Sequence, residues 1–110
     1  MKFKYNDGGR KKAGYKGQDN DCVVRAIAIV LEIPYKDVYD ALYNPRGVYI
    51  ETYDKYLVER GYRYKRFRRK ELPPGRLIIR IDRHIYAVLD GVVNDTHNWN
   101  QKIFGYYEKV

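Results

Sequence analysis

Apolar side chains between residues 19 and 61 recur at the spacing of amphipathic helices. Residues 23–31 are apolar on all sides except at Arg25, so the helix expected at residues 22–32 is predicted to be buried in the centre of the domain. Pro34 ends this run, and two shorter segments with apolar and tyrosine positions follow before Gly61. We therefore expect three helices, at residues 22–32, 35–43 and 50–60.

After Gly61 the pattern changes to short segments rich in β-branched and aromatic residues. Asp90-Gly91 lies between two of them and is a favoured dipeptide for a two-residue hairpin turn. Five strands are expected, at residues 62–67, 77–81, 84–89, 92–96 and 105–109. Helices followed by strands indicate an α+β fold, with the helix that starts at Cys22 in the centre, packed on a small antiparallel sheet.

The first 18 residues show no sustained hydrophobic period. They contain five lysines, one arginine and four glycines, a composition typical of an irregular surface segment. We expect residues 1–18 to form an extended basic arm. Residues 19–110 are then expected to form a single domain, because the chain is too short for a second lobe.

Composition and charge limit the classes of function. The one cysteine, Cys22, excludes an internal disulfide, and no apolar stretch is long enough for a secretory signal or a membrane span. We therefore expect a cytoplasmic protein with no membrane partner. The formal net charge of +8 favours contact with an acidic protein or a nucleic acid, but it indicates no reaction.

Cys22 stands at the first turn of the predicted central helix. The residues before it, 19–21, are Asp-Asn-Asp, which can accept hydrogen bonds from the free amides of a helix start. A helix N-terminus and a nearby imidazole both stabilise a thiolate, so this position favours a nucleophile. The alternative is a small core residue, which its neighbours Val23 and Val24 favour.

The predicted hairpin brings a histidine and a carboxylate together. A two-residue turn at Asp90-Gly91 places Asp95 opposite Tyr86. His84 lies two residues from Tyr86 on the same strand face, so it becomes a diagonal neighbour of Asp95. A carboxylate on one imidazole nitrogen leaves the other free to take a proton from a thiol. Cys22, His84 and Asp95 are therefore the expected nucleophile, base and orienting acid.

The hairpin residues also have other interpretations. His84 fits a surface or capping histidine at a strand start, and Asp95 fits a turn carboxylate. His97 lies on the same face and is a rival base. His84, Asp95 and His97 have the ligand types of an open zinc site, but a chain with one cysteine and two histidines is poorly equipped for a metal centre. We expect neither a metal nor a cofactor.

A thiol enzyme also needs hydrogen-bond donors for the oxyanion that forms during acyl transfer. The backbone amide of Cys22 is one expected donor. Gln18 and Asn20 are the candidates for a side-chain donor, although Gln18 equally fits an ordinary polar loop residue.

The segments around the cysteine and the histidine resemble known sequence boxes. Residues 19–27, DNDCVVRAI, resemble the nucleophile box of ovarian-tumour-type (OTU) deubiquitinases, and His84-Ile85-Tyr86 is similar to their histidine box. The order Cys, His, Asp matches papain-like enzymes, so the resemblance implies a minimal papain-like fold and cysteine peptidase activity. Gln18 lies four residues before the cysteine, where papain-type enzymes place their glutamine six before it, and Asn20 replaces the OTU glycine. The domain is smaller than typical ubiquitin-cleaving members, so the resemblance does not imply ubiquitin as the substrate.

A larger part of the chain is similar to a family of small phage and bacterial proteins. The shared features are Gly8-Gly9-Arg10, the box at residues 21–27, and a hairpin that runs from His84 through Asp90-Gly91-Val92 to Asp95-Thr96. This resemblance implies a bacterial host cell or a phage-infected cell as the setting. It implies no particular activity.

Residues 62–70, YRYKRFRRK, interleave aromatic with basic side chains. Such a strand can bind phosphates while tyrosines stack on bases. The alternative is an edge strand kept soluble by its charge. The expected contacts with a substrate or a nucleic acid are Arg66, Arg68 and Arg69, together with Trp99, which can also shield the hairpin pair or anchor the core.

The leading hypothesis is a cysteine peptidase or related acyl-transfer hydrolase that acts on a peptide or isopeptide bond of a protein or peptide substrate. One alternative is a basic binding module for a nucleic acid or an acidic protein, with a structural Cys22. Another is a phage-encoded inhibitor that binds its target through a protease-like fold without catalysis.

Overall fold

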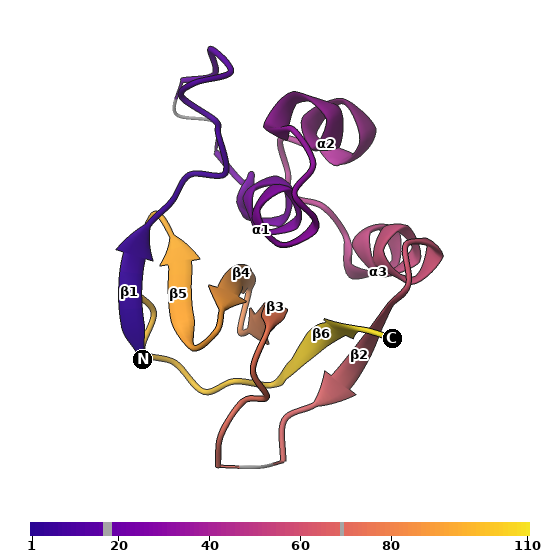
Figure 1. Ribbon diagram of the computed structural model, residues 1–110. Helices are drawn as coiled ribbons and strands as arrows, with labels where there is room; N and C mark the ends of the chain where they lie inside the picture. The colour runs from indigo at the N-terminus through magenta and orange to yellow at the C-terminus, as the bar shows by residue number, and fades with distance from the viewer. Residues whose placement is uncertain (17–18, 69) are drawn as a thin grey trace.

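Three helices lie on one face of a six-stranded sheet (Figure 1). The computed structural model describes residues 1–16, 19–68 and 70–110. The helices are α1 (Cys22–Leu31), α2 (Tyr35–Leu42) and α3 (Ile50–Glu59). The strands are β1 (Lys2–Tyr5), β2 (Tyr62–Arg66), β3 (Arg76–Ile81), β4 (His84–Leu89), β5 (Val92–Asp95) and β6 (Gly105–Lys109).

Helix α1 occupies the centre of the domain, as its apolar sequence predicts. All side chains from Val23 to Val30 are buried, and the helix packs against β4 on one side and α2 on the other. It ends at Glu32, which adopts the left-handed conformation (φ 56°). The first residue, Cys22, is partly exposed, so the buried helix opens to solvent at its N-terminal end.

The helix start differs from the expected cap in one respect. Asp21 is the N-cap residue, and its carbonyl accepts the amide of Arg25 at 2.9 Å. Its side chain forms no bond to the free amides of the helix. The carboxylate contacts the side chains of Arg25, Arg10 and Tyr35 instead, because buried cations compete for it more strongly than backbone amides do.

The strands follow the order β1-β5-β4-β3-β6-β2, and each neighbouring pair is antiparallel except β1 with β5. The inner strands are covered on both faces. Side chains such as Ile78 and Ala87 join the core under α1, whereas Ile79 and Val88 join a second apolar cluster on the opposite face, to which Trp99 packs. The sheet thus separates two cores.

The predicted hairpin register is confirmed at the three pairs next to the turn: Leu89 with Val92, Val88 with Val93 and Ala87 with Asn94.

The sheet differs from the expected one at its edge. The predicted basic arm contains a strand, because residues 2–5 pair in parallel with β5, and the sheet is therefore mixed. All four side chains of β1 are exposed, so no alternation of buried and exposed positions marks this strand in the sequence. No helix in the described ranges is long and apolar enough to cross a membrane.

Candidate active site

Cys22 and His84 meet where α1 packs on the sheet. Cys22 is the first residue of α1, and His84 is the first residue of β4, the strand under that helix. Burial acts to raise the pKa of the Cys22 thiol, but the hydrogen bond and charge of His84 lower it, together with the amide of Ile85 and the charge of Arg25. The net pKa of the thiol is lowered, which favours the thiolate.

His84 is held between a carboxylate and the thiol. Its Nε2 lies 2.8 Å from Oδ2 of Asp95, which leaves Nδ1 as the ring nitrogen available to the thiol. Burial acts to lower the pKa of the imidazole, but the hydrogen bonds to Asp95 and Cys22 raise it, and the net pKa is raised. The two shifts together favour a thiolate–imidazolium pair.

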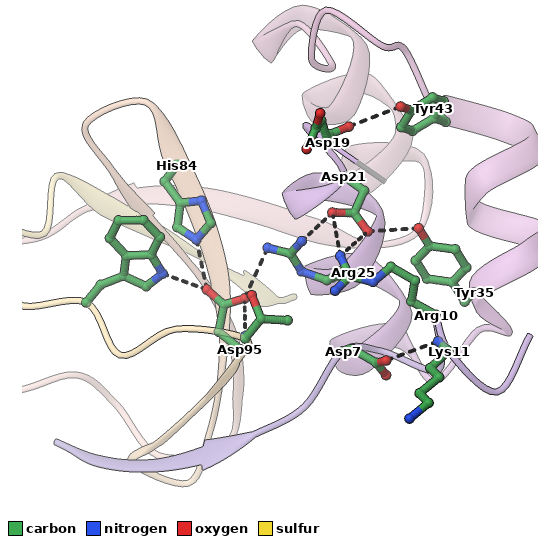
Figure 2. Close-up of polar contacts among 12 residues, drawn as sticks. Asp7, Arg10, Lys11, Asp19, Asp21, Arg25, Tyr35, Tyr43, His84 and Asp95 are labelled. Atoms are coloured by element: carbon green, nitrogen blue, oxygen red, sulfur yellow. Dashed lines mark hydrogen bonds and ion pairs between the residues drawn. The ribbon is translucent and has the colours of Figure 1, made fainter. Parts of the chain in front are cut away.

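Asp95 accepts hydrogen bonds from four donors (Figure 2). Oδ2 accepts His84 and Nε1 of Trp99 (2.7 Å), whereas Oδ1 accepts the amide of Thr96 (2.8 Å) and Nη2 of Arg25 (3.3 Å). Burial acts to raise the pKa of this carboxyl, but the hydrogen bonds from His84 and Thr96 lower it, and the net pKa is lowered. Asp95 is therefore held ionised against the imidazole.

A second buried carboxylate is linked to the first through Arg25. Nη1 of Arg25 contacts Oδ1 of Asp21, while Nη2 reaches Asp95, so one guanidinium bridges the two acids (Figure 2). Asp21 also accepts Nη1 of Arg10 at 3.2 Å and the hydroxyl of Tyr35 at 2.8 Å. The network ties the N-terminal segment, α1 and α2 to the base of the hairpin.

Sequence reasoning did not find this bridge. Two signals point to it in retrospect: Arg25 is the single charge in an apolar helix, and Asp21 lies four residues before it, at the spacing of a helical ion pair. The contact between Arg25 and Asp95 depends on how α1 packs on the sheet, which neither local sequence reveals.

The structure describes two of the three expected oxyanion donors. Gln18 lies outside the described residues. Asn20 lines the cavity at the thiol, but its side-chain amide donates to the carbonyl of Pro45 at 2.8 Å, so one of its two protons is already used. The backbone amide of Cys22 begins a helix and has no intrahelical partner, so it stays the expected donor.

A cavity of about 430 Å³ opens at the Cys22–His84 pair. We call it the charged cavity, because ionisable side chains dominate its wall. Besides the thiol and imidazole, it is lined by Arg10, Asp19, Asn20, Asp21, Arg25, Arg83 and Trp99.

Trp99 covers the imidazole as well as binding the carboxylate. Its ring centroid lies 4.2 Å from that of His84, and its Nε1 donates to Asp95. The indole therefore limits the access of water to this ion pair. His97, the rival base, is exposed, and its ring contacts Trp99 with a centroid distance of 4.8 Å. In residues 1–16, 19–68 and 70–110, no group of three or more His, Cys, Asp or Glu side chains is arranged to hold a metal ion.

The basic residues of the expected contact surface lie elsewhere. Arg66 and Arg68 line a separate cavity of about 310 Å³ that includes neither Cys22 nor His84. Two glutamates share that cavity, and one of them, Glu108, forms an ion pair with Lys65. Arg69 lies outside the described residues. The structure thus separates the basic strand from the thiol.

Comparison with known protein families, with curated proteins and with solved structures finds no match to this chain. The interpretation of the site therefore depends on its own geometry. That geometry brings Cys22, His84 and Asp95 together in the order thiol, imidazole, carboxylate.

Proposed function

We propose that the protein is a cysteine hydrolase that transfers an acyl group from a peptide or isopeptide bond to water through Cys22. One observation carries this proposal. His84 hydrogen-bonds to a buried, multiply bonded carboxylate, and it lines the same cavity as a thiol at a helix start. This is the arrangement that activates a thiol as a nucleophile and returns the proton to a leaving group.

The first half of the reaction forms a thioester. The Cys22 thiol gives its proton to Nδ1 of His84, and the sulfur attacks the substrate carbonyl, so that an S–C bond forms and the carbonyl oxygen becomes an oxyanion. The backbone amide of Cys22 hydrogen-bonds this oxyanion. When the tetrahedral intermediate collapses, the C–N bond breaks and His84 donates its proton to the leaving amine.

The second half uses water. His84 takes a proton from a water molecule whose oxygen attacks the thioester carbon. When this second tetrahedral intermediate collapses, the S–C bond breaks and His84 returns the proton to the sulfur. The products are a carboxylic acid and the regenerated thiol. Asp95 stabilises the imidazolium in both halves and holds Nε2 of the ring, so that Nδ1 stays free for proton transfer. Besides the substrate, the steps use only these residues and water.

Acyl transfer can be tested with p-nitrophenyl acetate, an activated ester that needs little substrate recognition. We expect release of p-nitrophenolate with turnover, and mass spectrometry of quenched samples to show acetyl on Cys22. His84→Ala is expected to lower the acylation rate by about 10²–10⁴-fold, because general base catalysis is lost.

His97→Ala is the matched control, since it removes the other, exposed histidine. It is expected to leave the acylation rate unchanged. The proposal fails if Cys22 is not acetylated, or if the two histidine variants react equally fast.

A further inference from the structure

A second cavity, of about 350 Å³, also opens at Cys22 and His84. Both residues line it, so the reacting pair stands between two cavities. We call the second one the apolar cavity. Its apolar wall consists of Val23, Val48, Ile50, Tyr53, Ile81, Ile85 and Phe104.

Regular structure holds this wall in place. Ile50 begins α3, Ile81 ends β3, and Phe104 precedes β6. The amide of Phe104 donates to the carbonyl of Arg80 at 2.9 Å, and its own carbonyl accepts the amide of Phe67 at 3.0 Å. The aromatic ring is therefore carried by backbone that is bonded on both sides. The cavity is formed before any ligand binds, and its volume lies in the range of small-ligand sites.

The mouth of the cavity leaves large apolar side chains open to solvent. Ile50 is 45% exposed and Phe104 is 41% exposed, and Tyr49, which precedes Ile50, is 63% exposed. Isolated exposed hydrophobic residues are common on protein surfaces. Here two of them border a cavity whose wall includes an activated thiol, so an apolar ligand would bury them beside the reacting atom.

The two cavities differ in the side chains that line them. In the charged cavity, Asp21 already pairs with two bases, Arg10 and Arg25. Arg80, Asp82 and Arg83 also line the apolar cavity, and Arg83, exposed in the turn before His84, lines both cavities. Seven of the twelve lining residues are nevertheless apolar or aromatic, so of the two cavities this one better suits a large apolar side chain.

We propose that the apolar cavity binds a leucine-like or phenylalanine-like side chain of the substrate, next to the bond that Cys22 attacks. The inference rests on the proposed function and names its substrate class: peptides with a large apolar residue beside the cleaved bond. Lining by both Cys22 and His84 makes the cavity continuous with the reacting centre.

The test compares two alkylating reagents on the folded protein. Iodoacetamide is small, whereas N-phenethyl iodoacetamide carries the same reactive carbon with an added phenyl group. In both cases the Cys22 sulfur displaces iodide, so an S–C bond forms and a C–I bond breaks. Rates are divided by those of a small free thiol, which removes intrinsic differences between the reagents. We expect the phenethyl reagent to react roughly tenfold faster or more with the protein.

Two variants and one control locate the effect. Ile50→Ser and Phe104→Ser are expected to bring the rate ratio close to that of the free thiol. Val58→Ser is the matched control, because Val58 is an exposed residue of the same helix that does not line the cavity. It is expected to keep the ratio of the parent protein.

Failure of this inference is distinguishable from failure of the proposed function. Fast alkylation by iodoacetamide with no preference for the phenethyl reagent would overturn the apolar site and leave the activated thiol standing. A preference that survives both Ile50→Ser and Phe104→Ser would also overturn it. Slow alkylation by both reagents would overturn the proposed function, and this inference with it.

Discussion

Two buried aspartates flank the same arginine in this protein, and they differ in what else they bind. Asp21 lies at the start of α1, and Asp95 lies at the end of β5; both contact Arg25. The remaining side-chain partners of Asp21 are Arg10 and a tyrosine hydroxyl. Those of Asp95 are the imidazole of His84 and the indole of Trp99.

Under the proposed function, this difference separates a structural acid from an acid that assists catalysis. Burying a carboxylate is costly unless donors and cations compensate, and both aspartates are compensated. Asp21 acts on groups that stay protonated, and so it fastens the N-terminal segment and α2 to α1. Asp95 acts on an imidazole that can gain and lose a proton beside a thiol. The neighbour of the carboxylate decides its role.

The largest expected effect is on acyl transfer in Asp95→Asn. All four partners of Asp95 are donors, so an amide NH₂ at this position faces a donor in either orientation. The ring of His84 loses its anchor and its imidazolium loses a negative charge. We expect acylation by p-nitrophenyl acetate to fall by about 10²–10⁴-fold, measured as kcat/KM. A loss of less than about threefold would show that Asp95 does not orient the base.

Removal of the shared cation is expected to have the next largest effect, this time on stability. Arg25→Met leaves two buried carboxylates without their common partner and is expected to lower the free energy of unfolding by about 3–5 kcal/mol. Urea denaturation followed by the fluorescence of the single tryptophan, Trp99, measures this change. Arg46→Met, at an exposed arginine, is the control and is expected to change stability by less than about 0.5 kcal/mol. Equal stability of the two variants would contradict the bridging role.

Asp21→Asn is expected to have the smallest effect on stability and on acylation. It tests most directly whether Asp21 and Asp95 have different roles. An amide oxygen in the Oδ1 position can still accept from Arg25 and Arg10, while the NH₂ in the Oδ2 position faces the tyrosine hydroxyl, which can accept. We expect a loss of about 1–3 kcal/mol in urea denaturation, with acylation within about threefold of the parent protein. Asp19→Asn, at an exposed aspartate, is the control. An acylation loss as large as that of Asp95→Asn would remove the distinction drawn between Asp21 and Asp95.

Local signals in the sequence predicted most helices and strands, and also the contact between His84 and Asp95. The three helices and five of the strands lie within one or two residues of their expected bounds, because apolar spacing and breakers such as Pro34 and Gly61 mark them. The Asp90-Gly91 turn sets the hairpin register, and with it the contact between His84 and Asp95.

Contacts between distant elements could not be predicted in the same way. Strand β1 exposes every side chain, so its pairing with β5 has no pattern to reveal it. The bridge from Arg25 to Asp95 spans 70 positions and depends on the packing of α1. Trp99 was expected near the hairpin pair, but its hydrogen bond to the carboxylate depends on the path of the loop after β5. The catalytic roles of Cys22, His84 and Asp95 stay predictions.

The measurement that tests the central claim most directly is the pH dependence of Cys22 alkylation by iodoacetamide in the folded protein. Only the thiolate reacts, so the midpoint of the profile reports the thiol pKa. Burial acts to raise this pKa, but His84 lowers it, so the thiolate persists, and alkylation continues, to a pH below the usual midpoint of about 8.5. The rate falls only as the pH drops through the lowered value.

His84→Ala removes the hydrogen bond and the charge but leaves the burial, so its midpoint is expected to rise above that of the parent protein. His97→Ala is expected to superimpose on the parent profile. A midpoint at or above about 8.5 in the parent protein, or the same midpoint in His84→Ala, would show that Cys22 is not activated by His84 and would contradict the account.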